Sequence, residues 1–295
     1  MINIILLLVL VLGLGLLLYP TVSDYWNEKS QSKAIASYEK SLNTLDRQKI
    51  AELWLAAEDY NRKLDQQNNI HKLTDLELTT YRSLLDVTGT GIMSYLQIPK
   101  IAVNLPIYHG TSETILQVGI GHLEWSSLPV GGLGTHAVIS GHRGLRSAKL
   151  LTDLDQLLLG DIFMIKVLNQ TLTYKVDQIK TVLPDQMEDL KIVDNQDLIT
   201  LFTCTPYGIN SHRLLVRGHR VSNEEVKLGL QANAEQVKAD YLVPIYTLII
   251  LVVYIIGRFL LRLIKEIVKT GSGGDQRKSL KGEKLAVKKP QARIG

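Results

Sequence analysis

The hydrophobic and polar positions divide the chain into three kinds of pattern. Long apolar runs occupy residues 4–18 and 241–257, near the two ends. Between residues 30 and 85, apolar side chains recur at spacings of three and four, and charged residues fill the other positions. Short apolar stretches separated by turn residues follow from Met93, and several of them alternate polar and apolar side chains. The pattern predicts helices followed by a β domain, with an apolar span at each end.

The first apolar run, extended by Met1, Ile2 and Tyr19, comes close to the ~20 residues that cross a bilayer. A cleaved signal peptide is the alternative interpretation. The positions before the run carry no Lys or Arg, and no cleavage site of the small-x-small kind follows it. We therefore expect residues 1–22 to form an uncleaved membrane anchor.

The second run is nearly long enough to span a membrane, and the following FLLRLIK extends it with arginines that can reach the interface. A buried core helix is the alternative. Such a helix would be apolar all round, and no other segment looks like its packing partner. We expect residues 241–264 to form a C-terminal transmembrane helix.

Charge is concentrated at the C-terminal end. Eleven basic and three acidic residues follow Gly257, so this end carries +8, whereas the whole chain carries +4. Basic residues beside a span favour the cytoplasmic side. Nucleic-acid binding is the competing interpretation, but the position beside a span favours contact with the inner membrane leaflet. With residues 265–295 as a basic cytoplasmic tail, the segment from about 23 to 240 lies outside the cell.

The first part of that outer segment, residues 23–92, is predicted to be a helical subdomain. Its apolar spacing is helical, and it contains no glycine or proline between Asn27 and Val87. Breaks between helices are expected near Asp46 and near QQNN at 66–69, and TGTG at 88–91 ends the helical zone.

The second part, residues 93–222, is predicted to be a β domain. Six to eight short strands can be counted there, and Asn169-Gln170 sits between two of them as a hairpin turn would. Short strands at such spacing favour a mainly β fold, a closed or nearly closed barrel. Residues 223–240 then link this domain to the second span.

Cys204 is the only cysteine of the chain. Structural cysteines outside the cell come in pairs, so Cys204 is a buried core thiol, an intermolecular bridge or a reactive nucleophile. LITLFTC reads as one strand, and RLLVRGHRV, after the loop 206–212, as the returning strand. An antiparallel pair places Cys204 opposite Arg213, with β-carbons about 4.5–5.5 Å apart. A guanidinium there favours the thiolate and can hold an oxyanion, although a solvated strand-end charge is the plainer interpretation.

A thiolate nucleophile also needs an acid that protonates the leaving group, which near neutral pH is usually a histidine. His109 and His122 lie in turn-rich stretches, and His136 begins a strand. His142 follows an apolar strand and is flanked by glycines, a position that suits a catalytic side chain. Spacing alone leaves His142, His122 and His136 as open alternatives.

Three motifs resemble those of the sortases, the membrane-bound cysteine transpeptidases of Gram-positive bacteria. TLFTC matches the family signature TLxTC, SGHRGL is similar to the family's histidine segment, and RLLVRG places Arg213 where the family has an arginine. YPTVSDYWN after the first run, YN at 60–61 and YLQIPKI at the start of the β domain resemble the pilus-assembling class C, as does the second span. The resemblance covers nearly the whole chain except the basic tail.

The resemblance implies a sortase-type closed β barrel of about seven to eight strands, carried by membrane anchors. It implies Cys204 as the nucleophile, His142 as the general acid and base, and Arg213 as the stabilising residue. The implied substrate is an LPxTG-like sorting signal, and the implied acceptor is a lysine of another pilin subunit. No cofactor or metal is expected, because no Cys/His cluster suits zinc and no acidic loop is spaced for calcium.

One departure from class C concerns the lid, which precedes the barrel and carries an Asp-Pro-aromatic motif. In the corresponding stretch, LLDVTGTGIMSYLQI, Asp86 is followed by Val87 and Thr88. We therefore expect Cys204 to be more open than in lidded relatives.

Three other functions remain alternatives. A sortase can attach surface proteins to a peptidoglycan precursor instead of to pilin lysines. The chain could also be a non-catalytic, membrane-tethered scaffold with an inert barrel. A cysteine hydrolase is the third alternative, because water can also resolve a thioester.

Overall fold

The computed structural model describes most of the chain, at residues 2–67, 73–223, 257, 258 and 261. Two compact units are present, Met1–Gln231 and Ala232–Gly295, and the described barrel and helices belong to the first. The predicted linker, second span and basic tail lie almost entirely outside the described residues.

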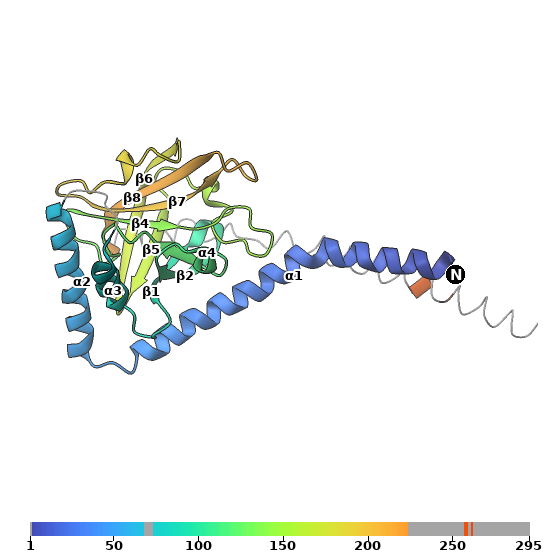
Figure 1. The fold of residues 1–295 in the computed structure, drawn as a ribbon, viewed down its shortest axis with the longest axis horizontal. Helices are drawn as coiled ribbons and strands as arrows, with labels where there is room; N and C mark the ends of the chain where they lie inside the picture. The colour runs from blue at the N-terminus through green and yellow to red at the C-terminus, as the bar shows by residue number, and fades with distance from the viewer. Residues whose placement is uncertain (1, 68–72, 224–256, 259–260, 262–295) are drawn as a thin grey trace, which may run out of the picture. The chain divides into compact units, whose positions relative to one another are not determined.

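Eight strands of the described part close into a barrel in the order β1-β2-β3-β4-β7-β8-β6-β5 (Figure 1). The strands are β1 (Ile92–Ile98), β2 (Val103–His109), β3 (Ile120–His122), β4 (Thr135–Ser140), β5 (Ile162–Val167), β6 (Gln170–Val182), β7 (Asp197–Thr205) and β8 (His212–Val221). The predicted mainly β barrel is confirmed. The three-residue β3 is too short to show alternation and is not among the apolar stretches seen in the sequence.

Most neighbouring strands are antiparallel, but β2–β3 and β4–β7 run parallel. Parallel neighbours require a crossover, and the short helix α4 (Glu113–Leu116) lies in the one between β2 and β3. Strands β5 and β6 form a hairpin in which Val167 pairs with Gln170. Its turn is therefore Leu168-Asn169, one residue before the predicted Asn169-Gln170.

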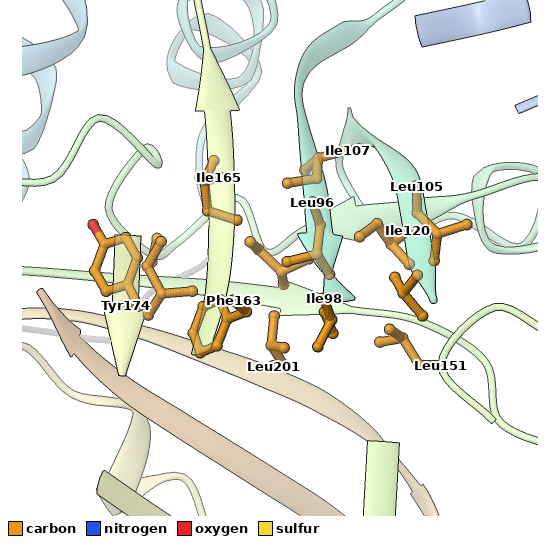
Figure 2. Packing of buried hydrophobic residues seen from close by; sticks show 14 of the residues in the cluster. Leu96, Ile98, Leu105, Ile107, Ile120, Leu151, Phe163, Ile165, Tyr174 and Leu201 are labelled. Atoms are coloured by element: carbon orange, nitrogen blue, oxygen red, sulfur yellow. The ribbon is translucent and has the colours of Figure 1, made fainter. Parts of the chain in front are cut away.

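The barrel is filled by apolar side chains from alternate strand positions (Figure 2). In β5, Phe163, Ile165 and Val167 are buried, whereas the residues between them are partly exposed. Phe163 stacks on Tyr174 of β6 with ring centroids 5.6 Å apart. Gly218 of β8 makes room for this pair, because a β-carbon there would lie 2.7 Å from the Phe163 ring. The core therefore requires a residue without a side chain at this point of β8.

Three helices, α1 (Ile2–Leu42), α2 (Arg47–Gln67) and α3 (Asp75–Ser83), lie outside the barrel wall (Figure 1). The expected break near Asp46 is present, and its Oδ1 accepts a hydrogen bond from the Lys49 N–H at 2.7 Å. α1 is the one helix of the described residues that is long and apolar enough to cross a membrane. The expected boundary after residue 22 falls inside α1, so the apolar run and the first helix of the subdomain are continuous.

Buried polar side chains attach the helices to the barrel. The Tyr38 hydroxyl of α1 donates to the Met93 carbonyl at 3.2 Å and accepts from the Leu168 N–H at 2.8 Å. The Asn61 amide of α2 donates to the Leu128 carbonyl at 3.0 Å and accepts from the Leu128 N–H at 2.7 Å. Because both side chains are buried, these bonds fix the position of each helix on the barrel.

Candidate active site

Cys204 and Arg213 are partners in the antiparallel ladder of β7 and β8, as their spacing in the sequence predicts. Cys204 is one residue from the end of β7, Arg213 is the second residue of β8, and Cys204 is partly buried. Arg213 Nη1 donates to the carbonyls of Asn210 and His212, each at 3.1 Å. These bonds hold the guanidinium at the loop end of the hairpin.

His142 is brought to the same end by the parallel pairing of β4 with β7. Ser140 pairs with Phe202, and the contact continues past β4, because the Gly141 N–H donates to the Phe202 carbonyl at 3.1 Å. Thr203 Oγ1 then donates to the Gly141 carbonyl at 2.8 Å. The segment that leads to His142 therefore runs beside the end of β7 that carries Cys204.

The His142 ring is partly exposed and faces a carboxylate. Its Nε2 lies 3.4 Å from Glu113 Oε1 of α4, and the exposed fraction of the His142 side chain is 29%. Gln117 and His142 both bond the Glu113 carboxylate and hold its pKa below the usual range. Sequence reasoning did not identify Glu113, and a four-residue helix offers no pattern that would point to it. A histidine in this setting can reach a bound substrate and exchange a proton with it.

Arg143 connects the His142 segment to the end of β7. Its Nη1 donates to Thr205 Oγ1 at 3.0 Å and its Nε to the Thr152 carbonyl at 3.1 Å, while Nη2 pairs with Asp155. Only 10% of the Arg143 side chain is exposed. The residue was not predicted as part of the site, although it belongs to the SGHRGL motif.

Gly144 allows the same segment to pack on the β7–β8 loop. Its φ is +81°, a conformation that favours glycine. A β-carbon at this position would lie 3.0 Å from the Tyr207 ring. The contact joins the loop after His142 to the loop after Cys204.

The other two histidine alternatives are buried within the fold. His122 is bound by the Tyr81 hydroxyl at Nδ1, 2.9 Å, and by the Ser127 carbonyl at Nε2, 2.7 Å. Burial lowers its pKa to about 3. His122 and His109 are the last residues of strands β3 and β2, each followed by a loop.

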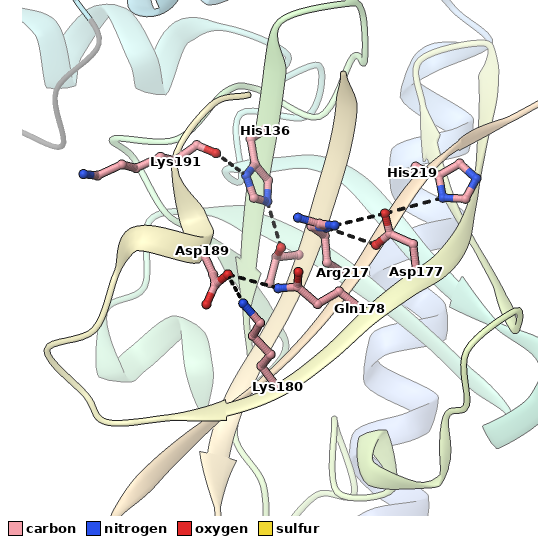
Figure 3. A network of polar contacts seen from close by, with 9 residues as sticks. His136, Asp177, Gln178, Lys180, Asp189, Lys191, Arg217 and His219 are labelled. Carbon is pink, nitrogen blue, oxygen red and sulfur yellow. Dashed lines mark hydrogen bonds and ion pairs between the residues drawn. The ribbon is translucent and has the colours of Figure 1, made fainter. Parts of the chain in front are cut away.

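His136 belongs to a polar network on the outside of the barrel (Figure 3). Its Nδ1 contacts the Lys191 carbonyl and its Nε2 contacts Thr200 Oγ1, each at 2.7 Å. Burial lowers its pKa to about 4. Nearby, Arg217 of β8 forms two hydrogen bonds with the Asp177 carboxylate of β6. The network connects strands to one another, so neither His136 nor His122 is free to serve the thiol.

Asp86, in the stretch compared with the class C lid, is bound within its own loop. Its Oδ1 accepts from the Thr88 N–H at 3.3 Å, and its Oδ2 accepts from the Gly91 N–H at 3.0 Å. Among the described residues, no group of three or more His, Cys, Asp or Glu side chains could hold a metal ion.

Comparisons with known proteins identify relatives of this chain. A family model for the sortase domain matches residues 96–221. Sortase C1 from Streptococcus agalactiae is 50% identical, with a TM-score of 0.64, over 65% of this chain and 99% of that one. Sortase C from Streptococcus pneumoniae, whose structure is described as informative on catalysis and pilin substrate specificity, is 44% identical, with a TM-score of 0.59, over 64% and 97%. Sortase D from Bacillus subtilis is 28% identical over 183 residues, 61% of this chain and 86% of that protein.

Proposed function

The chain belongs to the sortase family of cysteine transpeptidases and to its class C, and we propose that it joins pilin subunits through isopeptide bonds. One observation carries the proposal. Cys204 and Arg213 are ladder partners, and Gly141, the residue before His142, bonds to the Phe202 carbonyl of β7. This arrangement supports Cys204 as nucleophile, Arg213 as stabilising cation and His142 as proton carrier, which is the set that acyl transfer requires.

In the first step the Cys204 sulfur attacks the threonine carbonyl of an LPxTG-like sorting signal. A carbon–sulfur bond forms, and negative charge develops on the carbonyl oxygen, where the Arg213 guanidinium stabilises it. The carbon–nitrogen bond to the next residue then breaks. His142 gives a proton to the departing amine, so the products are a thioacyl enzyme and the released C-terminal segment.

In the second step the ε-amine of a lysine on another pilin subunit attacks the thioacyl carbon. His142 takes the proton from this amine, an amide bond forms, and the carbon–sulfur bond breaks. The thiolate is regenerated, and the two subunits are joined through a lysine side chain. No step needs a cofactor, because one amide bond is broken and one amide bond is formed overall, and the thioacyl enzyme carries the acyl group between them.

We further propose that the enzyme acts at the outer face of the cell membrane. The apolar helix α1 supports an anchor at the N-terminal end. The +8 charge that follows Gly257 supports a cytoplasmic tail after a second span. With both ends held in the membrane, the barrel faces the substrates that arrive at the cell surface.

The test supplies a sorting-signal protein with either a pilin subunit or a lipid-linked wall precursor. We expect ladder-like polymers with the pilin, and mass spectrometry should find the acyl group on Cys204. Single adducts with the wall precursor would instead support a sortase that anchors surface proteins. A Cys204→Ala variant that still builds polymers would support a non-catalytic scaffold, and release of free acid despite an amine acceptor would support a hydrolase.

A further inference from the structure

One turn of α1 binds the loop that follows His142. Ser23 Oγ donates to the Ser147 carbonyl at 3.0 Å, and Asn27 Nδ2 donates to the same oxygen at 2.6 Å. Asp24 Oδ1 accepts from the Lys149 N–H at 2.6 Å. All three side chains belong to YPTVSDYWN, a motif to which the proposed reaction gives no role.

The next turn of α1 binds the other segment that touches His142. Gln31 Nε2 donates to the Val118 carbonyl at 3.2 Å, and Gln31 is buried. Val118 lies between β3 and α4, the helix that presents Glu113 to the His142 ring. Because Asn27 and Gln31 are four residues apart, they lie on the same face of the helix.

The bound loop is connected directly to the His142 backbone. Asp24 fixes Lys149, and two residues later the Leu151 N–H donates to the His142 carbonyl at 3.2 Å. The α1 residues that make these contacts are partly or fully buried, whereas their neighbours Tyr25 and Trp26 are exposed. One face of α1 therefore carries the polar side chains that bind the two loops around His142.

We propose that Ser23, Asp24, Asn27 and Gln31, here called the α1 clamp, position His142 for its proton transfers. The inference rests on the proposed role of His142 as acid and base. These four are positioning residues, because none of them needs to touch the substrate. α1 is continuous from its apolar run through Pro20 to the clamp, so one helix joins the proposed membrane anchor to the proposed proton carrier.

A positioning role for the clamp can be distinguished experimentally from a role in the stability of the fold. Breaking an amide requires a proton on the departing nitrogen, whereas a nitrophenolate leaves without one. The experiment measures acylation of Cys204 in the full-length chain in detergent micelles. One fixed LPxTG-like peptide is used in two forms, either with its normal amide bond or as a nitrophenyl ester of the threonine carboxyl.

Two variants disrupt the clamp. Ser23→Ala combined with Asn27→Asp removes both donors to the Ser147 carbonyl, and Asp24→Ala removes the acceptor of the Lys149 N–H. We expect amide acylation to fall about 10- to 100-fold and ester acylation to change less than about two-fold, as a displaced proton donor predicts.

Two further variants serve as controls. Asp24→Asn keeps an acceptor oxygen for the Lys149 N–H. Its amide acylation rate should therefore stay near that of the unsubstituted chain. Glu28→Ala is the matched control for Asp24→Ala, because it also removes a carboxylate from α1 but at an exposed position. It should change neither rate.

If the two clamp variants lose acylation rate equally on both substrates, or on neither, the clamp does not position His142. A loss in Asp24→Asn as large as in Asp24→Ala would also count against it. His142→Ala serves as the reference for the proposed function. If that variant retains full amide acylation, the role of His142 is wrong whatever the clamp variants do, so the two failures are distinguishable.

Discussion

Arg143 Nη1 donates a 3.0 Å hydrogen bond to Thr205 Oγ1, and this bond joins the residue after His142 to the residue after Cys204. The two proposed reacting side chains come from different segments, β7 and the loop after β4, so their separation depends on contacts of this kind. Arg143 is largely buried and also binds Thr152 and Asp155. Its planar guanidinium serves three partners at once, which a lysine ammonium cannot reproduce.

We predict that Arg143→Lys lowers kcat for amide cleavage by about 10-fold or more while the barrel stays folded, because the proposed acid moves relative to the thiol. Thr205→Val, which removes the acceptor, should produce a smaller loss of the same kind. In a double-mutant cycle the two changes should be less than additive, with a coupling of about 1 kcal/mol. Steady-state kinetics measures this, and fully additive effects would show that the hydrogen bond does not act in catalysis.

Asn61 gives a second prediction, one about stability. Its buried amide makes two hydrogen bonds with the backbone of Leu128, one as donor and one as acceptor. Asn61→Asp keeps the size but places a carboxylate oxygen against the Leu128 carbonyl. We expect a loss of about 2–4 kcal/mol in the free energy of unfolding, measured by urea titration.

The matched control for this change is Asn169→Asp, since Asn169 is exposed in the turn between β5 and β6. The same amide becomes a carboxylate there, but in contact with water. It should alter the unfolding free energy by less than about 0.5 kcal/mol. If Asn61→Asp is equally mild, the two bonds to Leu128 do not hold α2 on the barrel.

The Cys204–Arg213 pair could be predicted from the sequence, because alternation along two strands and the length of their loop fix the ladder. His142 could not be selected by spacing. His122 is excluded only by burial in β3, a strand of three residues that shows no periodicity. The resemblance to a known family, rather than the pattern, singled out His142 among the histidines.

The contacts around His142 were beyond prediction for a different reason. Glu113 reaches the ring from a four-residue helix, and the bonds of Ser23 and Asn27 to Ser147 span 124 and 120 positions of the chain. Such contacts are set by where α1 packs on the barrel. Local pattern carries no information about them, although the YPTVSDYWN motif did mark the residues involved.

A third prediction concerns access to the thiol. The stretch compared with the lid lacks the Asp-Pro-aromatic motif, and Asp86 is bound within its own loop. We expect a small alkylating reagent to label Cys204 faster than the thiol of a relative that carries the motif. Because the chain has one cysteine, mass spectrometry gives a single-site rate, and Cys204→Ser is the blank. Equally slow labelling of the two proteins would contradict an open site.

The last prediction concerns acid stability and follows from His122. Burial lowers the pKa of His122 to about 3 in the folded chain, whereas an unfolded histidine has a pKa of about 6.5. Between these values the unfolded state binds a proton that the folded state does not. Stability is therefore complete above about pH 6.5 and falls as the pH drops, by about 1.4 kcal/mol per pH unit for this residue.

Urea unfolding at about pH 7, 6 and 5 should show this loss, which amounts to about 2 kcal/mol from His122 by pH 5. His122→Gln should be less stable at pH 7, because its bonds to Tyr81 and Ser127 are weakened, but its stability should decline more gently with acid. His136→Gln should flatten the decline in the same way, since burial lowers the pKa of His136 to about 4. An unchanged slope in His122→Gln would mean that His122 takes up its proton in the folded protein within this range.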